Sequence, residues 1–183
     1  PNRPDESNQP DDSRPASGEQ GMPDALRVIV EHKLEEVERR KAEISMTELE
    51  AMVAQAEPPR NFFRAVTRRP KGVHTSVIAE VKRRSPSAGL IRPEYEGDGF
   101  KPEAIAKQYF DAGASAISCL TDEKFFGGHL SFIERVKAAM PLPVLRKDFI
   151  IDPWQLWEAR AFGADAVLLI AECLTESMLV DLL

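Results

Sequence analysis

Cysteine, histidine and long apolar runs are all scarce in this 183-residue sequence. The two cysteines, Cys119 and Cys173, lie far apart inside apolar segments and form no CxxC pair. This spacing is typical neither of a metal site nor of a redox pair, and it favours two buried thiols in a reducing, cytoplasmic compartment. The histidines His32, His74 and His129 have no partner at metal-ligand or triad spacing. No apolar run approaches the roughly 20 residues of a membrane-spanning helix, so no membrane association is expected.

The charge balance excludes another class of protein. Thirty acidic residues against 24 basic ones give a net charge of −6, and nucleic-acid binders rely on an excess of positive charge. Two local basic clusters remain, at residues 68–71 and 82–84. They suit an anionic small molecule better than a polymer. The 43% of hydrophobic residues is enough for one buried core.

Residues 1–21 are predicted to be a disordered tail. They contain four prolines, five acidic residues, two arginines and a single apolar residue, Ala16. Such a segment has too little apolar surface to offset the entropy lost on ordering. It is also too acidic for a transit peptide and lacks the apolar core of a secretory signal. We therefore expect the tail to be dispensable.

Residues 22–70 are predicted to form a helical extension. Apolar residues at helical spacing predict a helix over 24–44, with the pairs Glu35/Arg39 and Glu36/Arg40 on its solvent face. A capping-box pattern at 47–50 predicts a second, short helix. The expected buried stripe of the first helix consists of Leu26, Val30, Leu34, Val37 and Ile44.

From residue 71 onward the sequence alternates between short apolar strands and helices. Near-continuous apolar strands in βα units predict a parallel sheet covered by helices. This pattern leaves two architectures open, a doubly wound open sheet and part of a (β/α)₈ barrel. The first expects a glycine-rich loop after the opening strand, where this chain has Arg-Arg-Ser-Pro-Ser at 83–87. The predicted strands begin near residues 77, 116, 144 and 166, and the last is expected to span 166–172.

A barrel also expects polar side chains at several strand ends. In the opening strand, Glu80 and Lys82 share one face, because side chains alternate along a strand. Considered alone, this pair is more simply interpreted as a solvated pair on an edge strand. Polar residues also stand at the predicted ends of the other strands: Thr121, Lys147 and Glu172.

Four segments closely resemble indole-3-glycerol phosphate synthase. They are IAEVKRRSPS at 78–87, LTDEKFFGG at 120–128, LRKDFIID at 145–152 and GADAVLLI at 163–170. The resemblance covers residues 24–183 and leaves out the tail. It implies a (β/α)₈ TIM barrel preceded by a helical extension, with residues 71–183 as the first half of the barrel.

The resemblance also implies a reaction. Enzymes of this family convert 1-(2-carboxyphenylamino)-1-deoxyribulose 5-phosphate into indole-3-glycerol phosphate, with loss of CO₂ and water, in tryptophan biosynthesis. No cofactor or metal is implied, and the expected partner is a small phosphorylated substrate. Lys147 matches the family's general-acid lysine, which protonates the ketone as the ring closes. Lys82 matches a lysine that engages the anionic groups, and Glu80 matches the carboxylate that positions the two lysines.

Four further residues match substrate-contacting positions of the family. Ser85 matches a serine suited to hydrogen bonds on the phosphate side. The three apolar residues match a wall against the anthranilate ring, although without the motifs core packing is the simpler interpretation of the phenylalanines. They are Phe126, Phe149 and Leu168.

The sequence departs from the family in three respects. Ala88 stands where a lysine is common, and the loop at 93–100 is longer than usual. Only the first four βα units are found, so a later glutamate base and the phosphate-binding loops are missing. We therefore expect this chain to be inactive by itself. The alternatives are a non-catalytic half-barrel that assembles with another chain and a relative that acts on a different substrate.

Overall fold

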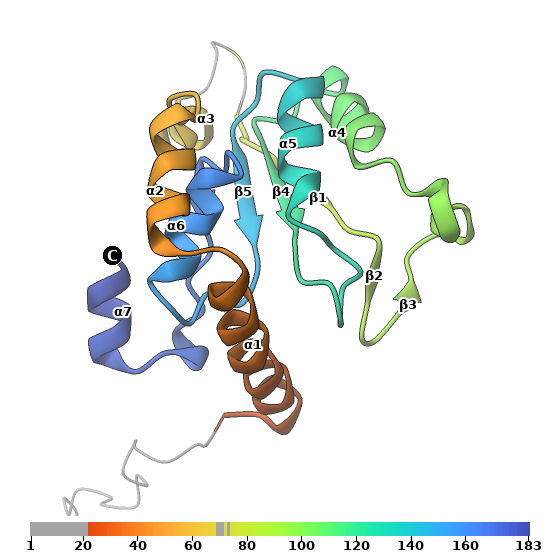
Figure 1. Ribbon diagram of the computed structural model, residues 1–183. Coiled ribbons are helices and arrows are strands. Elements are labelled where there is room, and N and C mark those ends of the chain that lie inside the picture. Colours follow the sequence, from red (N-terminus) through yellow and green to blue (C-terminus); the bar gives the residue numbers. More distant parts are fainter. Residues whose placement is uncertain (1–21, 69–71, 73) are drawn as a thin grey trace, which may run out of the picture.

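Residues 22–68, 72 and 74–183 are described by a computed structural model with a mixed α/β architecture (Figure 1). Four parallel strands form one sheet in the order β1-β4-β5-β6. This arrangement confirms the predicted α/β class with a parallel sheet, and it is consistent with part of a barrel. The strands are β1 (Ile78–Val81), β4 (Ala116–Leu120), β5 (Val144–Lys147) and β6 (Ala166–Val167).

Helices connect the strands of this sheet. They are α4 (Pro102–Asp111), α5 (Ser131–Ala139) and α6 (Trp154–Ala161), and α7 (Glu176–Leu182) follows β6. Pro102 opens α4 at a position where its missing N–H costs nothing, and Thr175 caps α7 by accepting from the backbone N–H of Met178 at 3.2 Å. Both helix starts agree with the sequence pattern.

The strands pair in a register set by buried apolar residues. All five residues of β4 are buried, because β4 lies between β1 and β5. Ile117 pairs with Val144, and Leu145 pairs with Ala166. The predicted strand at 166–172 is too long, since β6 ends at Val167 and a 3₁₀ turn occupies Ala171–Cys173. Among the described strands, β6 has only β5 as a neighbour, and the two are paired at Leu145–Ala166 and Arg146–Val167.

The extension before the sheet contains three helices. They are α1 (Asp24–Glu43), α2 (Met46–Gln55) and α3 (Phe62–Thr67), of which α3 was not predicted. The capping box of α2 also lies two residues earlier than predicted. The Ser45 hydroxyl accepts from the Glu48 backbone N–H at 3.3 Å, and the Glu48 carboxylate accepts from the Ser45 N–H at 2.8 Å.

The buried face of α1 agrees in part with the predicted stripe, since Val37 is buried and Leu26, Val30 and Ile44 are partly buried against the apolar clusters. Ile29, Lys33 and Val37 are its buried residues, whereas Leu34 is 54% exposed. The predicted pairs are replaced as well, because Arg39 pairs with Glu43 and Arg40 pairs with Glu158 on α6. Tertiary contacts therefore add Ile29 and Lys33 to the buried face and leave Leu34 exposed.

The apolar core divides into three clusters. The main cluster lies between the sheet and its connecting helices, around Ile117, Ile133 and Val144. Two smaller clusters join α1 to the rest of the molecule, one around Ile29 and Phe149 and the other around Val37, Leu49 and Trp154. In Figure 1 the arrows of β4 and β5 point toward the side on which α1 lies. The helix α1 therefore packs near the carboxyl ends of the strands, whereas Arg60, just before α3, bonds to Asp165 and Leu142 near the amino ends of β6 and β5.

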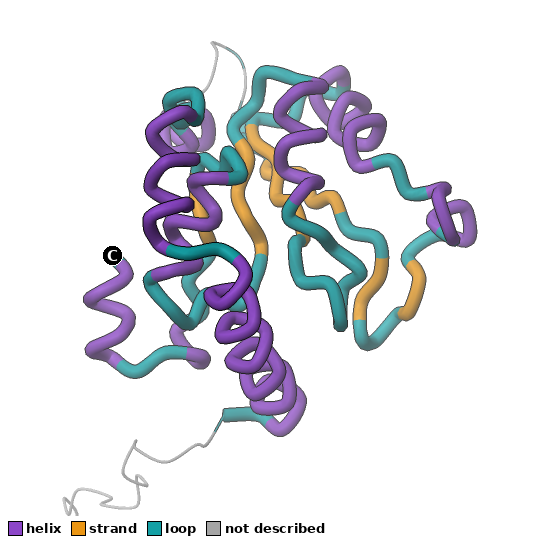
Figure 2. The backbone as a smooth tube through the Cα atoms, in the orientation of Figure 1, coloured by secondary structure: helices purple, strands orange, loops and turns teal. Residues whose placement is uncertain are grey.

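Loops and a small hairpin surround those strand ends (Figure 2). β2 (Arg84–Ser85) and β3 (Gly89–Leu90) pair antiparallel, and two 3₁₀ turns follow, at Pro93–Tyr95 and Gly97–Gly99. The Arg83 guanidinium holds this loop by donating to the carbonyl oxygens of Tyr95 at 3.0 Å and Gly97 at 2.9 Å. The long loop at 93–100 is therefore anchored to the end of β1.

Some sequence-based predictions concern residues outside the described ranges. The disordered tail at 1–21 lies outside them, and so does the boundary proposed between residues 70 and 71. The division into tail, extension and half-barrel thus stays a prediction. None of the helices within the described ranges is long and apolar enough to cross a membrane.

Candidate active site

Three charged side chains meet at the carboxyl ends of β1 and β5. The Glu80 carboxylate accepts from the Lys82 ammonium at 2.5 Å and from the Lys147 ammonium at 2.6 Å. Glu80 lies on β1 and Lys147 ends β5, with β4 between them, so the carboxylate bridges two strands that do not pair. The structure thus brings together the three residues that the sequence proposed as catalytic.

This charge cluster is accessible to solvent. The exposed fractions of the Glu80, Lys82 and Lys147 side chains are 29%, 31% and 38%. Burial alone would raise the pKa of Glu80, but hydrogen bonds from Lys147 and Lys82 outweigh burial and lower that pKa below its ordinary value. Glu80 is therefore ionised at neutral pH. Two ammonium groups around one carboxylate leave a positive charge facing the solvent, which favours an anionic ligand.

Two aromatic side chains lie on the loops that follow β4 and β5. The ring centroids of Phe126 and Phe149 are 6.1 Å apart, and the ring planes are tilted by 39°. Phe149 is buried and Phe126 is half-buried, and both belong to the apolar cluster around Ile29. The phenylalanines predicted to form one wall are thus neighbours.

Ser85 and Leu168 are less closely tied to this group. Ser85 lies on β2, where its hydroxyl accepts from the Ala88 N–H at 3.2 Å. The neighbouring Arg84 N–H donates to the Phe126 carbonyl at 3.3 Å, which joins the hairpin to the aromatic loop. Leu168 follows β6 and is half-buried. No hydrogen bond or ion pair in the described part of the chain joins Ser85 or Leu168 to Glu80 or the two lysines, so their roles stay predictions.

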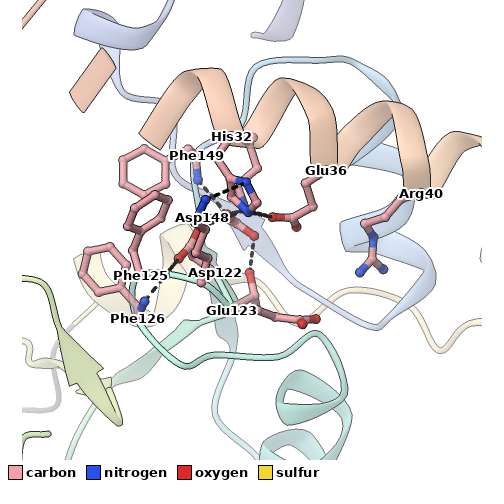
Figure 3. A network of polar contacts seen from close by, with 12 residues as sticks. His32, Glu36, Arg40, Asp122, Glu123, Phe125, Phe126, Asp148 and Phe149 are labelled. Carbon is pink, nitrogen blue, oxygen red and sulfur yellow. Dashed lines mark hydrogen bonds and ion pairs between the residues drawn. The ribbon is translucent and has the colours of Figure 1, made fainter. Parts of the chain in front are cut away.

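A second charge cluster lies behind the first, and the sequence analysis missed it. The Lys33 ammonium lies 2.9 Å from Glu36, 3.1 Å from Asp122 and 2.9 Å from Asp148. Figure 3 shows Glu36 on α1 facing Asp122 and Asp148, with Phe125, Phe126 and Phe149 beside them. Lys33 stands four residues from Ile29 and four from Val37, on the same face of α1. That spacing was the available signal for its burial.

Arg146 extends this buried cluster on the other side of Asp148. Its guanidinium lies 3.1 Å from the Asp148 carboxylate and 2.9 Å from that of Glu158, and it donates to the Gln155 carbonyl at 3.1 Å. Burial alone would raise the pKa of Asp148, but Arg146 and Lys33 outweigh burial and hold that pKa at about 2. The pKa of Lys33 is raised, because Asp148, Asp122 and Glu36 outweigh the effect of burial.

Cys119 and Cys173 are both free and buried, and burial raises the pKa of Cys119 to about 12. Such a thiol is unreactive at neutral pH. Within the ranges that the structure describes, no group of three or more His, Cys, Asp or Glu side chains is arranged to hold a metal ion.

Comparison with known proteins agrees with the resemblance noted in the sequence. The model of the indole-3-glycerol phosphate synthase family matches residues 26–183. The indole-3-glycerol phosphate synthase of Acidithiobacillus ferrooxidans is 48% identical over 161 residues, which cover 88% of this chain and 59% of that protein. The synthase of Rhodospirillum rubrum is 45% identical over the same shares of the two chains. That of Neisseria meningitidis is 44% identical over 158 residues, 86% of this chain and 59% of its own length.

The chain thus spans 59% of the length of these curated relatives. The family model matches well over half of the chain, and it includes α1 from its third residue onward as well as the sheet. The four motifs that carried the resemblance lie within the matched range. The chain therefore belongs to the indole-3-glycerol phosphate synthase family.

Proposed function

We propose that this chain supplies part of the active site of an indole-3-glycerol phosphate synthase. The reaction is the ring closure of 1-(2-carboxyphenylamino)-1-deoxyribulose 5-phosphate, with loss of CO₂ and water. The observation that carries the proposal is the pair of hydrogen bonds from Lys82 and Lys147 to Glu80. Family membership supports the same reaction.

Lys147 is the proposed general acid. Ring closure turns the substrate's ketone into an alkoxide, and a lysine ammonium can both stabilise that charge and deliver a proton to it. Glu80 holds the ammonium at 2.6 Å, which limits the directions in which the Lys147 side chain can point. A group oriented before the substrate arrives loses less entropy in the transition state.

Lys82 and Ser85 are the proposed contacts to the substrate's anionic groups. Lys82 lies at the same strand ends as Lys147 and shares the Glu80 carboxylate with it. Ser85 lies on the hairpin that is joined to the Phe126 loop. The apolar wall of Phe126, Phe149 and Leu168 would hold the aminobenzoate ring by stacking and exclusion of water.

The four βα units are proposed to be part of an eight-unit barrel. Among the described strands, β1 pairs only with β4 and β6 only with β5, whereas each strand of a closed barrel has two neighbours. We propose that residues 1–183 by themselves do not turn over the substrate, because the family's later glutamate base and phosphate-binding loops are not among them. Without those loops the substrate is loosely oriented, which alone can cost ~10²-fold in rate.

A reducing compartment such as the cytoplasm is part of this proposal and suits the two free thiols.

Steady-state kinetics tests the proposed function on the full-length protein, by which we mean the polypeptide with all eight proposed βα units. Formation of the indole product can be followed by its fluorescence, with the polypeptide of residues 1–183 measured in parallel. We expect turnover by the full-length protein, none by residues 1–183, and a loss of at least ~10² in kcat for Lys147→Ala. Lys107→Ala is the matched control, because Lys107 is 52% exposed and pairs with Asp111 on its own helix.

Two results would contradict the proposal. A full-length protein that does not consume this substrate would exclude the reaction. Near-normal turnover by Lys147→Ala, with folding checked by circular dichroism, would remove Lys147 from the mechanism while leaving the reaction in place.

A further inference from the structure

Lys33 is a wholly buried cation on the helix that precedes the sheet. Its side chain has 0% exposure, and it is the one lysine classed as buried in the described part of the chain. A charge removed from water needs partners that replace its hydration. Lys33 has three carboxylate partners, Glu36 on its own helix and Asp122 and Asp148 beyond β4 and β5. Lys33 thus connects α1 to the ends of two neighbouring strands, β4 and β5.

The two strand-end carboxylates shape the loops that carry the proposed wall. Asp122 accepts from the backbone N–H groups of Phe125 at 2.8 Å and Phe126 at 3.2 Å. Asp148 accepts from the backbone N–H of Phe149 at 2.9 Å. Asp122 therefore uses Oδ1 to fix an aromatic loop (Figure 3) and Oδ2 to face Lys33. Asp148 uses Oδ1 for both the Phe149 N–H and Lys33, and its Oδ2 accepts from Thr121 and Arg146.

Lys33 lies between these carboxylates and so links the two loops. Asp122 and Asp148 follow neighbouring strands and are both almost wholly buried, so their charges repel strongly in this environment. A cation between them turns that repulsion into attraction. Asp148 directly follows Lys147, so a shift of the Asp148 loop also moves the proposed acid.

We infer that Lys33 is a positioning residue for the chemistry at Lys147, acting through Asp122 and Asp148. Its kinetic consequence rests on the proposed function. The extension helix α1 is then part of the active-site support, and not only a cover for the end of the sheet. A displacement near 1 Å of a catalytic group can cost as much as ~10²-fold in rate.

Three variants of the full-length protein test this inference. Lys33→Met removes the charge and keeps most of the side-chain volume, and we expect kcat to fall at least ~10-fold. Lys33→Arg keeps the charge and should recover at least ~3-fold of that loss. Lys41→Met is the matched control, because Lys41 also joins α1 to a carboxylate of the barrel, Asp152 at 2.6 Å. Its kcat should stay within ~2-fold of the wild-type value, since its partner Asp152 is not among the carboxylates that accept from the Phe125, Phe126 and Phe149 amides.

A double variant separates positioning from stability. Lys33→Met combined with Asp122→Asn removes one charge of each sign, so the buried charges are better balanced than in Lys33→Met alone. We expect its urea midpoint to recover toward the wild-type value while kcat stays at least ~10-fold low. If kcat recovers together with the urea midpoint, the role of Lys33 is structural and the inference is wrong.

Amide hydrogen exchange gives a readout that does not depend on the reaction. The amides of Phe125, Phe126 and Phe149 should exchange at least ~10-fold faster in Lys33→Met than in Lys41→Met, because their acceptors are released. If the wild type proves inactive on the substrate, the proposed function fails and exchange alone decides the inference. Unchanged exchange, or a kcat of Lys33→Met within ~2-fold of wild type, overturns it. Should Lys33→Met not fold, the double variant with Asp122→Asn is measured in its place, and exchange of the Phe149 amide, whose acceptor Asp148 is unchanged, decides the inference.

Discussion

Two charge clusters lie at the carboxyl ends of the strands, the open one at β1 and β5 and the buried one at β4 and β5, and they differ mainly in their access to water. Lys147 points to the open side, where its side chain is 38% exposed. Its neighbours Arg146 and Asp148 point to the other side, where exposure is 1% and 3%. Alternation along one strand therefore separates the two environments by a single residue.

The comparison teaches how similar residue types take different roles. In the open cluster, two lysines share one carboxylate, which leaves positive charge for a ligand. In the buried cluster, Lys33, Arg146 and their carboxylates are all paired with one another, so little remains for a ligand. The open cluster suits catalysis, and the buried cluster supports the loops around it.

Arg146→Met should give the largest effect, because it breaks the buried cluster directly. Asp148 and Glu158 would each lose a cation in a site with almost no water. Breaking a buried pair typically costs about 3–5 kcal/mol of unfolding free energy. Urea unfolding would measure it, with Arg135→Met as control, since the Arg135–Glu103 pair is 40% and 36% exposed. A loss below about 1 kcal/mol for Arg146→Met would mean that the buried pairs contribute no more than surface ones.

Acid should weaken the buried cluster through Asp148. Its pKa in the folded protein is about 2, below the ordinary 3.8, so the folded state binds this proton less readily than the unfolded state. The resulting stability, roughly 2 kcal/mol at 1.36 kcal/mol per pKa unit, is present above pH 4 and lost between about pH 4 and 2. Unfolding curves across that range would reveal it. Asp148→Asn should flatten this limb, whereas Asp111→Asn, in an exposed pair, should retain it.

Glu80→Gln tests the open cluster, where we expect a loss of activity and little loss of stability. Loss of the carboxylate releases both lysines, so we expect kcat to fall at least ~10-fold while the unfolding free energy changes by less than about 1 kcal/mol. Kinetics and urea unfolding on the same preparation would separate the two quantities. A variant that is destabilised but fully active would reverse the assignment of roles to the two clusters.

The smallest effect is expected for a surface pair on α1. Arg39 and Glu43 are 2.7 Å apart, but their side chains are 59% and 55% exposed. Arg39→Ala should therefore change the unfolding free energy by no more than about 0.5 kcal/mol and leave kcat unchanged. A larger loss in thermal or urea unfolding would show that α1 depends on its solvent face as well as on Lys33.

Local patterns were sufficient for much of the fold and for part of the site. Apolar runs between capped helices predicted β1, β4 and β5 closely, since strand and helix periods are properties of neighbouring residues. Strand alternation also put Glu80 and Lys82 on one face, and the structure joins them at 2.5 Å. The predicted N-cap of α2 was wrong, because Ser45 competes with Thr47 for the same role and Ser45 caps the helix. The predicted length of β6 was wrong as well, because it depends on pairing with the neighbouring strand β5.

The sequence by itself determined the alternation of elements, the charged residues at the strand ends and, through its motifs, the family. Only the tertiary structure decided which partner each charge has. Arg40 meets Glu158 across 118 residues of chain, and Lys33 meets Asp148 over a similar separation. The helical or strand periodicity of neighbouring residues does not indicate such a contact, because the contact depends on how α1 docks against the folded sheet. The burial of Lys33, and with it the support behind Lys147, follows from that docking.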